Sequence, residues 1–143
     1  MLKFVIPGLS AFALISLLAM PAPAFAETVK LKADLKASEE VPPTESSGAG
    51  TAEFTLDTDA NKVSWKVTSE NLTGDVTAAH FHGPAKLGEN APPVVDISGN
   101  LNEGSADVTA DQLQMIREGN TYLNLHTAKY PDGEIRGQVL QLE

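Results

Sequence analysis

Residues 51–68, TAEFTLDTDANKVSWKVT, decide the fold class of this chain. Apolar and polar side chains alternate over 52–56 and again over 63–67, and the stretch between them has the composition of a turn. Such alternation is typical of strands with one buried face. Two such strands joined by a short polar connection predict an antiparallel hairpin. Phe54 and Trp65 lie in the apolar register, so we expect both in the core.

The same alternation continues on both sides of this hairpin. It predicts further strands at 29–35, 76–82, 94–97, 121–127 and 134–142. One short helix is expected after Thr109, because Thr109 and Gln112 have the spacing of a capping box and Gly119 suits a helix end. The chain is therefore predicted to be all-β: an antiparallel β-sandwich of about seven or eight strands with one short helix. A closed barrel is the alternative.

The first 26 residues differ in composition from the rest of the chain. Lys3 precedes a mostly apolar run at 4–20, and the Pro- and Ala-rich stretch 21–26 ends in Ala-Phe-Ala. This is the pattern of a cleaved signal peptide. We expect cleavage before Glu27, a single domain of residues 27–143 and a periplasmic or secreted location. No membrane association is expected after cleavage.

Charge and cysteine content exclude several classes of function. The chain has 10 Lys and Arg against 19 Asp and Glu. One of the basic residues is Lys3, so the predicted domain carries 9 against 19, a net charge of −10. An acidic surface disfavours binding to duplex nucleic acid and to anionic lipid. Because the chain has no cysteine, thiol catalysis, disulfides and thiolate metal ligands are excluded.

The three histidines of the chain are candidate metal ligands. His80 and His82 lie two positions apart in one predicted strand, so they share a face while Phe81 points to the other. His126 ends another predicted strand and is out of register with the leucines of that strand. Neutral imidazole is a good ligand for Zn(II) and Cu(II), and three imidazoles on the non-core face predict a site for either ion. The alternative is that the histidines are surface residues hydrogen-bonded to loop backbone.

Three charged residues near the C-terminus are candidates for supporting the metal ligands. Asp132 or Glu134 would contact the metal ligands from outside, and Arg136 lies two positions beyond Glu134. An acidic residue or water would complete the ligand set itself. Residues two apart on a strand share a face. We therefore interpret Glu134 and Arg136 as a partly exposed ion pair, with the orientation of a ligand as the alternative.

Five segments, in order along the chain, resemble motifs of the CHRD domain, a family named after chordin. They are Glu40-Val41-Pro42-Pro43, Gly50–Phe54, Ala78-Ala79-His80-Phe81-His82-Gly83-Pro84-Ala85, Tyr122–Thr127 and Tyr130–Gln138. The resemblance implies an all-β extracytoplasmic module. In chordin the domain belongs to an extracellular protein that binds growth factors, and in bacteria it often forms an exported protein by itself. His80, His82 and His126 fall on matched positions, but the family implies no activity for them.

A looser resemblance connects the chain with copper-zinc superoxide dismutase, which also has a His-x-His on a strand of a β-sandwich and a later histidine. Residues 133–136 resemble its Gly-x-Arg segment, but the disulfide cysteines and the zinc-site histidines of that family are missing.

Three hypotheses for the function follow. The first is a non-enzymatic exported module that binds Cu(II) or Zn(II) for sequestration or delivery. The second is a metal-free protein-interaction module, and the third is a superoxide dismutase-like copper enzyme.

Overall fold

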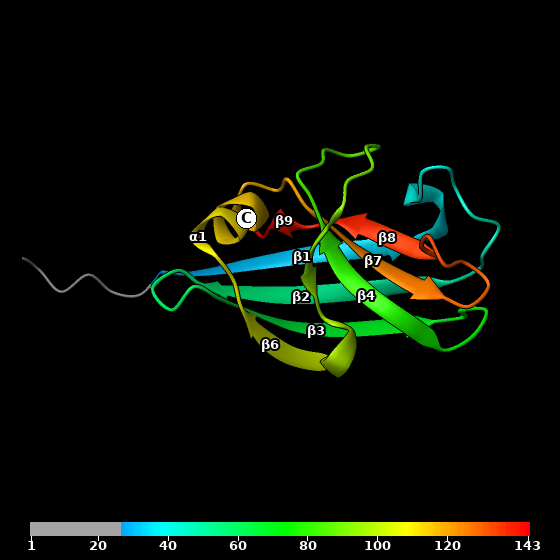
Figure 1. Cartoon of the computed structure of the whole chain (residues 1–143), viewed down its shortest axis with the longest axis horizontal. Coiled ribbons are helices and arrows are strands. Elements are labelled where there is room, and N and C mark those ends of the chain that lie inside the picture. Colours follow the sequence, from blue (N-terminus) through cyan, green and yellow to red (C-terminus); the bar gives the residue numbers. More distant parts are fainter. Residues whose placement is uncertain (1–26) are drawn as a thin grey trace, which may run out of the picture.

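The computed structural model describes residues 27–143 (Figure 1), so the predicted signal peptide lies outside the described residues. Within this range the chain forms nine strands, one α-helix and two short 3-10 turns. The elements are β1 (Thr28–Lys36), η1 (Ala37–Glu39), β2 (Ala49–Asp57), β3 (Lys62–Glu70), β4 (Val76–His82), β5 (Pro93–Asp96), η2 (Ser98–Asn100), β6 (Glu103–Asp107), α1 (Ala110–Arg117), β7 (Tyr122–Thr127), β8 (Ile135–Gln138) and β9 (Leu140–Gln141).

All nine strands belong to one antiparallel sheet in the order β5-β4-β7-β8-β1-β2-β3-β6, with β9 beside β1. Figure 1 shows β4 crossing over β2 and β3. Phe54 of β2 contacts Phe81 of β4, with ring centroids 5.0 Å apart, although three strands separate β2 from β4 in the sheet. The sheet therefore curls until its two halves face each other. The predicted all-β fold with one short helix is confirmed, and the two layers are the halves of a single sheet.

The hydrophobic core fills the space between the two halves. Alternate residues of β1, β2, β3, β4 and β7 enter it, as the period-two pattern predicts. The completely buried core residues include Leu31, Leu56, Val63, Phe81, Leu123, Leu125 and Ile135. Each such side chain stabilises the fold by about 1.5–3 kcal/mol. Phe54 and Trp65 are 2% and 5% exposed, which confirms their predicted place in the core.

The predicted hairpin of 51–68 is present as β2 and β3, which pair over their full lengths. Strand β6, which the alternation pattern did not predict, lies beside β3 at the edge of the sheet. Its Gly104 stands opposite Trp65, and a Cβ atom there would lie only 2.7 Å from the indole ring. Strand β6 is held by backbone pairing and by this close approach. Neither requires apolar residues at alternate positions, so the sequence pattern does not reveal the strand.

Helix α1 begins as the capping box predicts. The Thr109 hydroxyl accepts from the Gln112 backbone N–H at 3.1 Å, and the Thr109 N–H donates to the Gln112 side chain at 2.9 Å. Gly119, just beyond the helix, has a φ of +75°, which glycine adopts without strain. Over residues 27–143, the structure contains no helix with the length and apolar character needed to span a membrane.

Candidate metal centre

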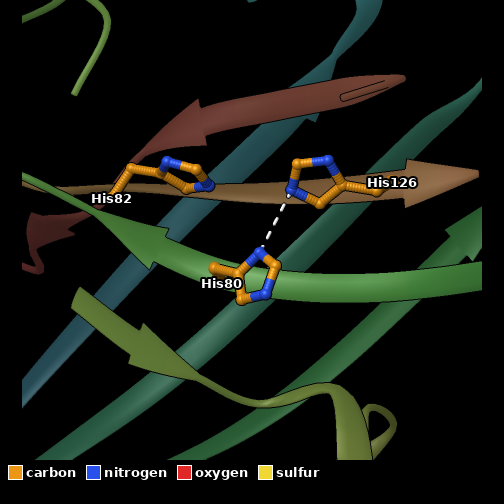
Figure 2. A group of neighbouring side chains, drawn as sticks. All are labelled: His80, His82 and His126. Atoms are coloured by element: carbon orange, nitrogen blue, oxygen red, sulfur yellow. Dashed lines mark hydrogen bonds between the residues drawn. The ribbon is translucent and has the colours of Figure 1, made fainter. Parts of the chain in front are cut away.

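The two histidine-bearing strands are neighbours in the sheet. In the register of β4 and β7, His126 lies opposite Ala78, and His80 lies opposite Asn124. Phe81 points into the core, so His80 and His82 point to the other face of the sheet, where His126 joins them (Figure 2). This is the arrangement that the alternation of β4 and β7 predicts.

The three imidazoles converge on a common space. One ring nitrogen from each of His80, His82 and His126 can be chosen so that all three lie within 4.8 Å of one another. Nδ1 of His80 lies 3.2 Å from Nε2 of His126. Figure 2 shows the His82 ring extending from the other side toward this pair, with a nitrogen at its leading end. The predicted convergence of residues 46 positions apart is thus present in the fold.

Backbone carbonyls select the nitrogens that face this space. Nδ1 of His82 lies 2.8 Å from the Ala91 carbonyl oxygen, and Nδ1 of His126 lies 2.9 Å from that of Pro131. A carbonyl oxygen can only accept, so both Nδ1 atoms carry the proton and both Nε2 atoms carry a lone pair. Nε2 of His82 is buried and has no hydrogen-bond partner within the described part of the chain. An unpartnered buried acceptor costs about 1–3 kcal/mol, which a cation bound to it would offset.

An acidic residue that the sequence did not indicate lies beside His80. Its Nε2 lies 3.9 Å from Oδ1 of Asp96, which stands opposite it on β5. The same Asp96 oxygen accepts from the backbone N–H and the hydroxyl of Ser98, at 2.8 and 2.5 Å. A carboxylate on the outer side of a histidine is the usual support of a metal-ligating imidazole. Since Asp96 reaches His80 only through the β4–β5 pairing, strand order would have been needed to find it.

Burial favours the neutral form of two of the imidazoles. His82 and His126 are each 8% exposed. Burial lowers the pKa of both rings below the ordinary 6.5, and this outweighs their carbonyl contacts, which raise it. The neighbouring histidines lower the pKa of His82 further. Both rings are therefore neutral at neutral pH, which is the state that binds a metal.

Arg136 reaches the histidine cluster through Tyr122. The Tyr122 ring stacks on the His82 ring, with centroids 4.9 Å apart and planes inclined by 6°. The Arg136 guanidinium lies over Tyr122, 4.3 Å from its centroid, and donates to the Glu39 carbonyl at 2.6 Å. Nε of Arg136 lies 3.9 Å from Oε2 of Glu40, a carboxyl whose pKa burial raises to about 7 despite the opposing effect of the Arg136 charge.

Our interpretation of Glu134 and Arg136 as a partly exposed ion pair is wrong. The two residues are 0% and 3% exposed. The Glu134 carboxylate accepts hydrogen bonds from Ser46, Thr73 and Thr127, none of which is a histidine. The error arises because loops cover the non-core face of the sheet here. From alternation alone, side chains on that face are expected to be exposed to solvent.

Asp132 lies at the exposed turn that follows β7. Its negative charge raises the pKa of His126, against the larger effect of burial. Its backbone carbonyl accepts a long hydrogen bond, 3.4 Å, from the Asn124 side chain. Asp132 therefore acts on the cluster through its charge, from outside the group of converging nitrogens.

Comparison with known protein families is consistent with this fold. A family model described as the CHRD domain matches residues 31–139, and the match includes all three histidines. Searches of curated proteins and of solved structures returned no match to the chain.

Proposed function

The chain belongs to the CHRD family, and from this premise we propose that it is an exported, non-enzymatic module that binds one Cu(II) or Zn(II) ion through His80, His82 and His126. The observation that carries the proposal is the convergence of one nitrogen from each residue within 4.8 Å. The export rests on the pattern of residues 1–26.

The three donor atoms are Nε2 of His82, Nε2 of His126 and Nδ1 of His80. In the metal-free protein Nε2 of His126 accepts a hydrogen bond from Nδ1 of His80, so a bound ion would replace this hydrogen bond and displace its proton. Two nitrogens on a tetrahedral ion with bonds of 2.0–2.1 Å lie about 3.3 Å apart. The His80–His126 separation of 3.2 Å already matches this value. Binding thus requires His82 to approach the other two while its contact with Ala91 is kept.

The surroundings of the histidines suit reversible binding. Three protein ligands leave one coordination position of a four-coordinate ion open for exchange with another molecule. His80 has 23% of its side chain exposed, whereas His82 and His126 are buried, so an ion would reach the site past His80. The acidic chain, with a formal net charge of −9 including residues 1–26, attracts cations. These properties support sequestration or delivery of the metal.

Titration calorimetry tests the proposal. The metal-free protein should bind one equivalent of Cu(II) or Zn(II) with a Kd below about 10 μM, which corresponds to roughly −7 kcal/mol. His82→Ala should weaken binding more than tenfold. Glu53→Gln, which removes an exposed carboxylate from β2, serves as the matched control and should bind like the wild type. No binding below 10 μM, or equal binding by His82→Ala, would overturn the metal function.

Family membership favours one alternative. CHRD domains are interaction modules, and a metal-free protein-binding role would leave the histidines as structural residues. A negative titration would support this alternative, and pull-down with extracytoplasmic proteins would then be the next step. The copper enzyme hypothesis is tested separately, by superoxide consumption of the copper-loaded protein.

A further inference from the structure

Tyr122 contacts the proposed metal ligand His82 directly and also contacts the loop residue to which His82 is hydrogen-bonded. The Tyr122 ring lies parallel to the imidazole, with centroids 4.9 Å apart. The Tyr122 hydroxyl also lies 3.3 Å from the Ala91 carbonyl oxygen and 3.2 Å from the Ala91 backbone nitrogen. That same carbonyl accepts from Nδ1 of His82 at 2.8 Å. Tyr122 thus contacts both the ring of His82 and the group that selects its tautomer.

From this arrangement we propose that Tyr122 is the positioning residue of the metal centre: it holds His82 so that Nε2 carries the lone pair and points at His80 and His126. The proposal rests on the proposed metal function and assigns a residue that acts through a ligand without binding the ion.

Tyr122 is itself fixed from the side opposite His82. The Arg136 guanidinium covers its other face, 4.3 Å from the ring centroid. Arg136 also donates a hydrogen bond, 3.0 Å long, to the side chain of Asn90, the residue that precedes Ala91. Arg136 and His82 therefore both lie against the Tyr122 ring, and Arg136 and His82 hold the loop segment 89–91 through hydrogen bonds to Glu89, Asn90 and Ala91. A cation over one face of a tyrosine holds the ring by about 0.5–2 kcal/mol.

The stack accounts for the buried and unpartnered state of Nε2 of His82. In a mobile side chain, an imidazole would rotate to satisfy both nitrogens. Here rotation about χ2 would break the Ala91 hydrogen bond, and the parallel Tyr122 ring restricts tilting of the imidazole. The donor atom is thus held for the ion, which lowers the cost of ordering the ligand on binding.

Two variants separate the two contacts of Tyr122. Tyr122→Phe removes the hydroxyl at Ala91 and keeps the ring stack, whereas Tyr122→Leu removes both. Residues that orient a metal ligand typically contribute 10–100-fold to affinity. We expect Zn(II) affinity, measured by competition with a chelator, to fall about tenfold in Tyr122→Phe and up to 100-fold in Tyr122→Leu. Tyr130→Phe, at the turn after β7, is the matched control and should bind like the wild type.

A double-mutant cycle shows whether the effect passes through His82. Once His82→Ala has removed the ligand, Tyr122→Phe should change the remaining affinity less than twofold. A merely structural role would lower affinity equally in both backgrounds and would overturn the proposal. Equal affinities of wild type, Tyr122→Phe and Tyr122→Leu would also overturn it while leaving the proposed function intact. Absence of binding in the wild type overturns both.

A readout that needs no metal covers the case in which Tyr122→Leu fails to fold. The ¹⁵N shifts of the His82 ring in the metal-free protein distinguish the two tautomers. The wild type should show the Nδ1–H form alone, and Tyr122→Phe should show a mixture. A single Nδ1–H tautomer in Tyr122→Phe contradicts the role of the hydroxyl.

Discussion

Glu134→Gln removes a charge from a fully buried carboxylate. Glu134 is 0% exposed and accepts four hydrogen bonds: from Ser46 Oγ at 2.5 Å, Thr73 N at 2.8 Å, Thr73 Oγ1 at 2.7 Å and Thr127 Oγ1 at 2.6 Å. The carboxylate thereby ties the loop before β2 and the loop before β4 to the end of β7. We expect the substitution to destabilise the fold.

The size of the destabilisation depends on which oxygen of the Glu134 carboxylate the substitution replaces. Glutamine keeps one carbonyl oxygen, which can still accept from Ser46 and the Thr73 N–H. Its amide nitrogen cannot accept from the hydroxyls of Thr73 and Thr127. A hydrogen bond to a charged group contributes about 1.5–3 kcal/mol, and rotation of the hydroxyls recovers part of this. We expect the free energy of unfolding to fall by about 2–4 kcal/mol, and Tm to fall by about 10 °C.

The same carboxylate makes stability depend on pH. Burial raises the pKa of Glu134, but the hydrogen bonds from Ser46, Thr127 and Thr73 outweigh it, so the folded pKa lies below the ordinary 4.5. A group whose pKa is lowered by folding stabilises the protein above its unfolded pKa, and this contribution is lost as pH falls through the folded pKa. The stability difference between wild type and Glu134→Gln should therefore narrow below about pH 4.5.

Urea denaturation at neutral and acid pH measures both effects. Glu53→Gln is the control, because that carboxylate is exposed, and its unfolding free energy should change by less than about 0.5 kcal/mol. A loss below about 1 kcal/mol in Glu134→Gln at pH 7 would refute the reasoning. Since the Glu134 carboxylate bonds to hydroxyls and one backbone N–H, metal affinity should stay within about threefold of the wild type, or 0.7 kcal/mol. A larger loss would show that Glu134 supports the metal ligands.

Other perturbations have equally definite outcomes. Because burial lowers the pKa of His82 and His126, the folded protein binds fewer protons than the unfolded chain just below pH 6.5. Stability of the metal-free protein should therefore decline as pH falls from about 6.5. Calorimetry should show that metal affinity falls at lower pH than this, where the folded rings take up protons at Nε2. Gly133→Ala should cost about 2–4 kcal/mol by thermal unfolding, since Gly133 has a φ of +125° and an added Cβ would collide with the Asn124 side chain. Thr109→Ala removes the cap of α1 and should cost about 1 kcal/mol in urea, with an unchanged histidine cluster in NMR spectra.

Much of the fold could be predicted from local pattern. The 51–68 hairpin, the strand that carries His80 and His82 and the capping box at Thr109 are all present as predicted. Their signals are local: a two-residue period, turn composition and a three-residue spacing. Strand β6 has no such signal, because its register with β3 depends on backbone pairing and on the close approach of Gly104 to Trp65.

The candidate site likewise has residues that the sequence predicted and residues that only the structure revealed. The period of the strands placed the three histidines away from the core, and the structure brings them together. Asp96 and Tyr122 were not found, because their contacts with His80 and His82 depend on which strands are neighbours and how the loops return. The burial of Glu134 and Arg136 was missed for a related reason. Alternation predicts that the non-core face of β7 and β8 is exposed to solvent, but loop segments cover it.

By itself, the sequence determined that this protein is an acidic, cysteine-free, all-β domain with its histidines on the non-core face, because side-chain alternation and composition are properties of the chain. Only the tertiary structure decided that the sheet curls into one continuous body, that three imidazoles meet within 4.8 Å and that carbonyls of Ala91 and Pro131 select their free nitrogens. Those features depend on contacts between segments distant in sequence, and such contacts follow from strand order and loop packing.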